Sequence, residues 1–147
     1  MKPIVLRPGE GEAVHLGTAA STSFKAEGPH TGSSLSITEN VLAPGFPGPV
    51  PHTHRHTFDI FYVLEGTIAF QLGNASIEAP AGAFVLVPPG IVHAFRNSSG
   101  AAARFLNVQT PAGLEQYLKE VAAESHGGAP DASRMAAIAS KYDFVAV

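Results

Sequence analysis

Short apolar segments alternate with turn residues over roughly the first 109 of the 147 positions, and this pattern restricts the fold more than any other feature. Gly73-Asn74 is typical of a two-residue hairpin connection, and Glu65-Gly66 is expected to act in the same way. Many short strands joined by tight turns predict an all-β fold, either a sandwich or a barrel. The expected strands are 4–7, 13–16, 21–26, 35–42, 50–54, 59–64, 67–72, 75–79, 83–87, 92–96 and 102–109.

The strand expected at 59–64 is apolar on both faces. One face carries Phe61 and Val63, and the other carries Tyr62 between two aliphatic neighbours. A small barrel covers only the inner face of its strands, so the outer face needs a helix or a second subunit. This strand therefore predicts a homo-oligomer.

The pattern changes after the last expected strand, where apolar residues recur at helical spacing. Thr110 is expected to cap a first helix with Pro111 at its first position, and Asp131 is expected to cap a second. The linker between these helices is expected at 127–130. The sequence thus predicts one domain over 1–147, with a barrel at about 13–109 and a helical tail at about 110–142.

Composition excludes several classes of function. The formal net charge of −3 offers no basic excess for a phosphate backbone, so a nucleic-acid partner is not expected. No apolar run reaches the ~20 residues that span a bilayer, and the N-terminus lacks the apolar segment of a secretion signal. These features predict a cytoplasmic protein with no membrane partner. Because cysteine is absent, any metal must be held by histidine and carboxylate side chains.

Three of the seven histidines fall close together, at positions 52, 54 and 56. Residues two apart on a strand share a face, so His52 and His54 can point at one ion. Asp59 follows five positions after His54, and His93 lies in another expected strand. Three imidazoles and one carboxylate suit a divalent transition metal. We therefore expect a metal site formed by His52, His54, Asp59 and His93.

These residues resemble the two motifs of the cupin superfamily. The second motif, G-x5-P-x-G-x2-H-x3-N, is matched in full at Gly82, Pro88, Gly90, His93 and Asn97. The first motif, G-x5-H-x-H-x3–4-E-x6-G, is matched at His52, His54 and Gly66. This sequence has Asp59 where the family has Glu, and Phe46 where the family has the leading Gly. The resemblance implies a small jelly-roll β-barrel that holds one metal and forms a homodimer.

The departure at Asp59 leaves two roles open for this residue. Its side chain is one methylene shorter than Glu, so it either ligates the metal or acts beside it as a catalytic base. A second register, which uses His54 and His56 as ligands, fits the family spacing less well. In the preferred register, His56 lies outside the ligand set, where it caps the metal loop, faces solvent or relays protons.

A cavity beside the metal is expected to be apolar. If His93 points inward, Phe95 lies on the same face of its strand and lines the cavity. The other candidates for the wall are Phe24, Phe61, Val63, Phe70 and Phe105. An apolar pocket suits a small-molecule substrate that is aromatic or otherwise hydrophobic.

Residues 110–113, with the sequence Thr-Pro-Ala-Gly, resemble the start of the tail in quercetinase-like cupins. This resemblance implies a dioxygenase in which a substrate oxygen binds the metal and Asp59 takes its proton. The same residues also suit redox-free isomerisation, cyclisation or decarboxylation, or ligand binding without catalysis. The metal can be Fe, Mn, Ni, Co, Cu or Zn, because this donor set does not discriminate among them.

Overall fold

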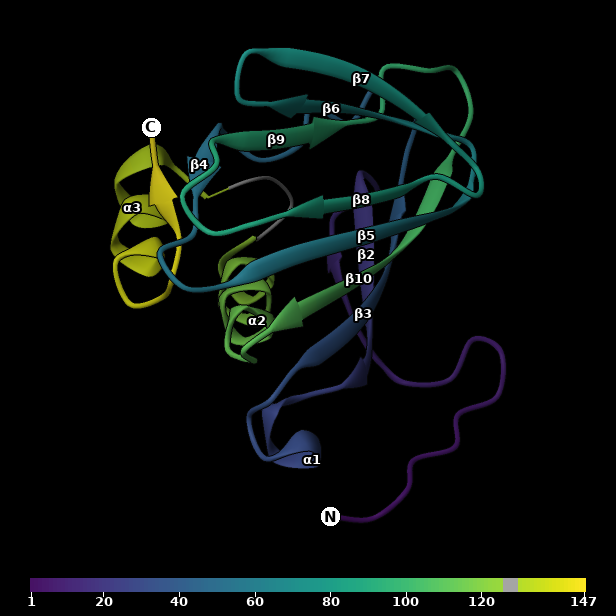
Figure 1. Cartoon of the computed structure of the whole chain (residues 1–147), viewed down its shortest axis with the longest axis vertical. Helices are drawn as coiled ribbons and strands as arrows, with labels where there is room; N and C mark the ends of the chain where they lie inside the picture. The colour runs from purple at the N-terminus through teal and green to yellow at the C-terminus, as the bar shows by residue number, and fades with distance from the viewer. Residues whose placement is uncertain (126–129) are drawn as a thin grey trace.

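The computed structural model describes residues 1–125 and 130–147, in which two antiparallel sheets face each other (Figure 1). Their strands are β1 (Glu12–Leu16), β2 (Ala20–Ala26), β3 (Ser36–Leu42), β4 (His52–Thr53), β5 (Phe58–Glu65), β6 (Thr67–Leu72), β7 (Ala75–Pro80), β8 (Phe84–Val87), β9 (His93–Arg96), β10 (Ala103–Thr110) and β11 (Val145–Ala146). The six-stranded sheet has the order β1-β2-β3-β10-β5-β8, and the five-stranded sheet has the order β11-β4-β9-β6-β7. The predicted jelly-roll architecture is confirmed, as two sheets rather than one closed barrel.

The two predicted tight connections have different roles. Gly73-Asn74 forms the predicted hairpin between β6 and β7. Glu65-Gly66 instead carries the chain from one sheet to the other, so the hairpin expected there is wrong. Gly66 has a φ of +70°, and a Cβ at this corner would lie 2.7 Å from the carbonyl oxygen of Ala102. The corner therefore requires glycine for both conformation and space.

The strand expected at 4–7 is not formed. These residues belong to an exposed N-terminal arm that extends away from the sheets (Figure 1). Apolar residues alone do not make a strand here, because no strand of the described part of the chain pairs with the arm's backbone. The strand expected at 50–54 is also shorter than predicted and covers only His52–Thr53.

Aromatic side chains from both sheets fill the space between them. Phe61 on β5 lies 5.0 Å from Phe70 on β6 and 5.6 Å from Phe105 on β10, measured between ring centroids. All three are at most 2% exposed. This packing fixes β5 against the opposite sheet and so places Asp59, two residues before Phe61, at one end of the core.

The helices are α1 (Gly28–Thr31), α2 (Leu114–Glu124) and α3 (Ala132–Ala139). The cap predicted for α2 is wrong, because Thr110 is still part of β10 and the helix begins after Gly113. The buried carboxylate of Glu115 accepts a hydrogen bond from the Gly113 N–H over 2.6 Å and thereby holds this start. Asp131 caps α3 as predicted, by accepting from the Arg134 N–H over 2.8 Å.

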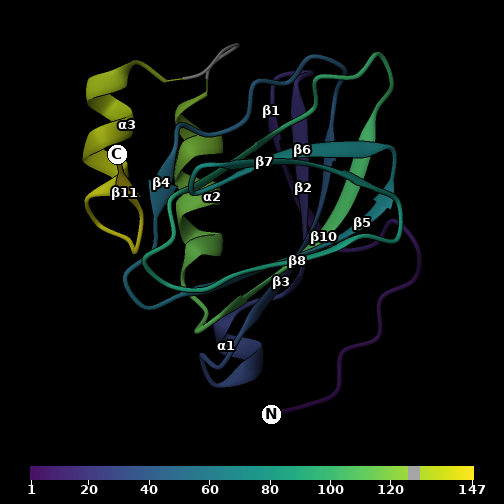
Figure 2. The same cartoon turned by 45° about the horizontal axis from the view of Figure 1, so that its top comes forward.

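Both tail helices lie at one end of the sandwich, beside β4 (Figure 2). Leu114, Tyr117 and Val121 form the buried stripe of α2 and pack with Ile138 of α3. The predicted linker at 127–130 lies outside the described residues except for Pro130. No helix within 1–125 or 130–147 combines the length and hydropathy that a membrane span requires.

The outer face of the six-stranded sheet is apolar along β5 and β8. Tyr62 pairs in register with Phe84, and their side chains are 46% and 61% exposed. Ile60 pairs with Leu86 beside them. The prediction that both faces of this strand are apolar is confirmed, and the exposure of Tyr62, Phe84 and Leu86 shows that the outer face is not covered by the described residues of the chain.

Candidate metal centre

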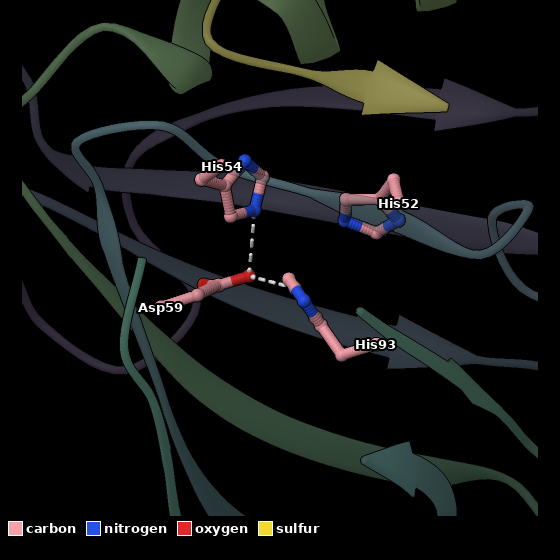
Figure 3. A group of neighbouring side chains, drawn as sticks. All are labelled: His52, His54, Asp59 and His93. Atoms are coloured by element: carbon pink, nitrogen blue, oxygen red, sulfur yellow. Dashed lines mark hydrogen bonds and ion pairs between the residues drawn. The ribbon is translucent and has the colours of Figure 1, made fainter. Parts of the chain in front are cut away.

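The structure brings the four predicted ligands together. His52 lies on β4, His54 follows that strand directly, and His93 lies opposite His52 on β9. Asp59 reaches the same point from β5 in the other sheet. One ligand atom from each residue lies within 4.8 Å of those of the other three, and all four side chains are buried. Figure 3 shows Asp59 between His54 and His93, with His52 beside them.

Each imidazole is oriented by a backbone carbonyl at its Nδ1 atom. His52 Nδ1 lies 2.8 Å from the carbonyl oxygen of Val50, and His93 Nδ1 lies 3.0 Å from that of Ile91. His54 Nδ1 lies 2.5 Å from the carbonyl oxygen of Asp143. A carbonyl only accepts, so Nδ1 donates and the lone pair falls on Nε2. This is the tautomer in which Nε2 can bind a metal.

The Asp59 carboxylate is held through one oxygen and faces the histidines with the other. Its Oδ1 accepts from the side-chain amides of Asn107 over 2.7 Å and Gln109 over 3.1 Å. Its Oδ2 lies 3.3 Å from His93 Nε2 and 3.4 Å from His54 Nε2. The neighbouring strand β10 therefore determines which oxygen points into the cluster.

The environment sets the charges of these groups. Burial and the neighbouring His93 lower the pKa of His52 to about 4, so this imidazole is neutral at physiological pH. Burial lowers the pKa of His54, but the Asp59 carboxylate and the hydrogen bond to the Asp143 carbonyl together outweigh that effect and raise the pKa overall. Burial raises the pKa of Asp59, but its two imidazole neighbours and Asn107 hold the pKa well below its usual range. The cluster thus combines a buried anion with a neutral imidazole at neutral pH.

This donor set fits a divalent transition metal. His54 Nε2 is fully buried and lies at ion-pair distance from Asp59 Oδ2, 3.4 Å away, but it makes no hydrogen bond among the described residues. Such an orphaned atom costs stability unless something in the site binds it. A cation bound by the three Nε2 atoms and Asp59 Oδ2 would satisfy this atom and neutralise the buried carboxylate.

His56 does not join the cluster. Its side chain is exposed, and only its backbone N–H points inward, to a carboxylate oxygen of Asp143 at 2.9 Å. His54 and His56 therefore diverge, which disfavours the alternative register that pairs them as ligands. The exposed position agrees with the expectation that His56 faces solvent outside the ligand set.

A cavity of about 490 Å³ adjoins the cluster, and His52, His54 and Asp59 form part of its wall. The rest of the wall is mainly apolar and comes from both the sheets and the tail helices, including Leu42, Phe95, Phe105, Tyr117, Met135 and Phe144. Its size is in the ordinary range for small-molecule sites, ~300–1,000 Å³. The cavity suits a small hydrophobic molecule that presents a polar atom to the cluster.

The predicted cavity residues divide into two groups. Phe95 lines the cavity, as does Phe105. Phe61, Val63 and Phe70 are at most 2% exposed and lie in the core between the sheets, behind the cavity wall. Core residues and cavity residues both point inward from their strands, so strand alternation does not distinguish them. One end of the sandwich is filled by packed side chains, and the other end contains the cavity.

Several residues of the site were not predicted from the sequence. Asn107 and Gln109 occupy inward positions of β10, and polar residues at such positions are a signal that could have identified them. Asp143 and Phe144 come from the far end of the chain, where the sequence carries no motif. Phe144 stacks on the His52 ring, with centroids 4.1 Å apart and planes at 16°.

Residues 39–109 match the family model described as "Cupin domain". The matched segment contains all four residues of the cluster, the whole of strands β4 to β9, part of β3 and most of β10. Together with the jelly-roll architecture, this match shows that residues 39–109 form a cupin domain.

Among curated proteins, the chain is 31% identical over 98 residues to quercetin 2,3-dioxygenase of Bacillus subtilis. This alignment covers 66% of the chain but only 28% of that enzyme.

Solved structures give the same architecture. KdgF from a Halomonas species superposes with a TM-score of 0.68 and 14% identity, over 78% of this chain and 99% of that one. The polyketide cyclase RemF from Streptomyces resistomycificus superposes with a TM-score of 0.61 and 25% identity, over 75% of this chain and 80% of that one. The named relatives include both a dioxygenase and a polyketide cyclase, so the site and its cavity must carry the functional argument.

Proposed function

We propose that this cupin is a metal-dependent dioxygenase that acts on a small aromatic or enolisable substrate, such as a flavonol-like phenol. The observation that supports this most is the position of His52, His54 and Asp59 in the wall of an apolar cavity of about 490 Å³. A planar aromatic molecule fits such a cavity and can direct a hydroxyl group towards the cluster.

The residues of the cluster have separate roles in this proposal. His52, His54 and His93 hold one divalent ion, either Fe, Mn, Ni, Co, Cu or Zn, through their Nε2 atoms. When bound, such an ion lowers the pKa of a substrate hydroxyl and, where it is redox-active, supports reaction with O2. Asp59 is ionised and directs Oδ2 into the site, so it accepts the proton of that hydroxyl.

The similarity to quercetin 2,3-dioxygenase supports dioxygenation over other cupin reactions. The similarity to a polyketide cyclase favours a second candidate, redox-free cyclisation with Asp59 moving protons. A third candidate is a binding protein that holds its ligand unchanged. All three use the same four residues and the same cavity.

Metal replacement separates these candidates. The apo-protein is loaded with Fe, Mn, Ni, Co, Cu or Zn and incubated in air with a panel of phenols and enols, and O2 uptake and products are measured. Dioxygenation requires O2 uptake with at least one redox-active metal and none with zinc. Turnover with zinc and without O2 uptake would support the redox-free candidate, and recovery of unchanged ligand in every case would support binding alone.

We further propose that residues 1–147 act as one domain and form a homodimer in the cytoplasm. The apolar outer face at Tyr62, Phe84 and Leu86 supports a second copy as the partner, because two copies of one face bury each other symmetrically. Light scattering should give twice the chain mass for the wild type and a monomer for Phe84→Lys. A wild-type monomer at micromolar concentration would contradict the dimer. Fractionation of cells that express the untagged chain tests the location.

A further inference from the structure

The C-terminal segment 142–147 extends the sheet that carries the candidate metal site. Strand β11 pairs antiparallel with β4, with Val145 opposite Thr53 and Ala146 opposite His52. The N–H of Val147 donates to the carbonyl oxygen of Pro51 over 3.0 Å. Figures 1 and 2 show this strand between α3 and β4. A segment some 90 positions distant in the chain is thus the direct neighbour of the metal strand.

Asp143 in this segment binds the loop that follows His54. Its Oδ1 accepts from the Arg55 N–H over 2.5 Å. Its Oδ2 accepts from the N–H groups of His56 and Thr57, over 2.9 and 3.0 Å, and from the Thr57 hydroxyl over 2.8 Å. Four donors on one carboxylate fix the backbone between His54 and β5. That backbone sets the distance between the His54 and Asp59 side chains.

The same residue also orients the His54 ring, because its backbone carbonyl accepts from His54 Nδ1. His52 and His93 rely on carbonyls only two positions earlier in their own segments. His54 relies on a residue 89 positions later. One of the three imidazoles therefore depends on the C-terminal segment for the hydrogen bond at its Nδ1 atom, whereas the Nδ1 atoms of the other two lie on local carbonyls.

Phe144 continues this contact with the site. Its ring stacks on His52 and, at a centroid distance of 4.8 Å and an angle of 21°, on Tyr117 of α2. The segment is thus anchored on one side by the tail helices and on the other by the metal strand. The position of this segment therefore depends on both the tail helices and β4.

We infer that Asp143 is a positioning residue of the metal centre, which acts through His54 and completes the site from outside the cupin motifs. The inference rests on the metal site of the proposed function. Loss of the carboxylate frees the loop of residues 55–57, so His54 no longer points its Nε2 atom at the ion. Residues that orient metal ligands in this way typically contribute ~10–100-fold to affinity.

Metal titration of the full chain tests this role. The stripped protein is titrated with Zn2+ in competition with a chelator, for the wild type, Asp143→Asn and Asp131→Asn. Asp131 is the matched control, because it is an exposed acidic residue of the same tail that caps α3. We expect Asp143→Asn to raise the Zn2+ dissociation constant about tenfold or more, and Asp131→Asn to leave it within about twofold.

A double-mutant cycle separates positioning from general loss of structure. If Asp143 acts through His54, Asp143→Asn has no further effect on Zn2+ affinity in a His54→Ala background. An equal loss in both backgrounds would overturn the inference. With Co2+ bound at saturation, the visible absorption bands of Asp143→Asn should differ from those of the wild type, whereas those of Asp131→Asn should coincide with them.

A milder variant covers the case in which Asp143→Asn does not fold. Thr57→Val removes one of the four donors and keeps the shape of a buried side chain, so it should weaken Zn2+ binding roughly two- to fivefold. Wild-type Zn2+ affinity in Thr57→Val, and in Asp143→Asn where that variant folds, would refute the role of Asp143 and leave the proposed function intact. A wild-type protein that binds neither Zn2+ nor Co2+ would refute the proposed function itself.

Discussion

Asn107 on β10 donates a hydrogen bond from its side-chain amide to Oδ1 of Asp59 on the neighbouring strand β5, over 2.7 Å in the buried interior. The same amide donates to the carbonyl oxygen of Ile60 over 2.9 Å. Because Asn107 is bound to both the Asp59 carboxylate and the backbone of the next residue, Ile60, it fixes Asp59 with Oδ2 towards the imidazoles. The role of Asp59 thus depends on a residue that lies outside the two cupin motifs.

Replacement of Asn107 should impair the site without unfolding the chain. In Asn107→Leu, Asp59 keeps only Gln109 as an amide donor, so its carboxylate is less fixed and its pKa rises. We expect about 10–100-fold weaker metal binding or turnover. The control is Gln116→Leu, which makes the same change in polarity at an exposed position of α2. Equal affinity in both variants would contradict the role given to Asn107.

The ligand assignment predicts which histidines hold the metal. His52→Ala and His93→Ala should each lose most of the bound metal, because each removes one of the three imidazole ligands. His56→Ala should retain it, because that side chain is exposed. Elemental analysis of the purified variants measures this directly. Full metal content in His93→Ala would show that the assignment is wrong.

Asp59→Ala tests the carboxylate. We expect turnover to be lost, because the proton acceptor is removed, and part of the metal to remain, because three imidazoles are left. Turnover is measured under saturating metal, so that weaker binding does not mimic loss of the base. Unchanged turnover in this variant would exclude Asp59 as the base.

Two phenylalanines on inward positions should respond differently to truncation. Phe61→Ala removes a side chain of the solid core, so the free energy of unfolding should fall by about 3–5 kcal/mol. Phe95→Ala enlarges the cavity instead, so stability should fall less and KM should rise more. Chemical denaturation and steady-state kinetics measure the two effects. A larger loss of stability in Phe95→Ala, together with a larger rise in KM in Phe61→Ala, would show that Phe61 lines the cavity.

The tail should lose a stabilising contact at alkaline pH. The hydrogen bond to the Glu120 carboxylate, together with burial, raises the pKa of Tyr142 to about 12 in the folded protein. A folded pKa above the unfolded value of about 10 gives stability that is complete below pH 10 and disappears as the pH rises through 12.

Tyr142→Phe removes this contact. At pH 8 the free energy of unfolding of the variant should be lower by about 1 kcal/mol, because the acceptor of the lost hydrogen bond is an ionised carboxylate but the bond is only partly buried. At pH 11 and above the difference should shrink. Urea denaturation at both pH values measures it, and a difference that grows with pH would contradict the assignment of Tyr142 and Glu120 as partners.

Much of the sheet and of the ligand cluster could be predicted from local sequence. His52, His54 and His93 follow from strand alternation and motif spacing, since those signals depend on residues only a few positions apart. The same holds for the Gly73-Asn74 hairpin and the Asp131 cap.

Other features depend on contacts between distant segments. Asp143 has the same local sequence character as many surface aspartates, and only the pairing of β11 with β4 brings it to the loop after His54. The cavity wall could not be separated from the core for a similar reason. Phe61 and Phe95 both face inward, and the position of the tail helices decides which of them borders open space.

Three of the cluster's side chains come from the five-stranded sheet or directly follow one of its strands, and Asp59 comes from the six-stranded sheet. An ion held by all four would therefore act as a cross-link between the two layers. Heat denaturation should report on its presence, because a ligand that binds only the folded state adds RT ln(1 + [L]/Kd) to stability. Occupancy of the metal site would thus determine how strongly the two sheets are held together.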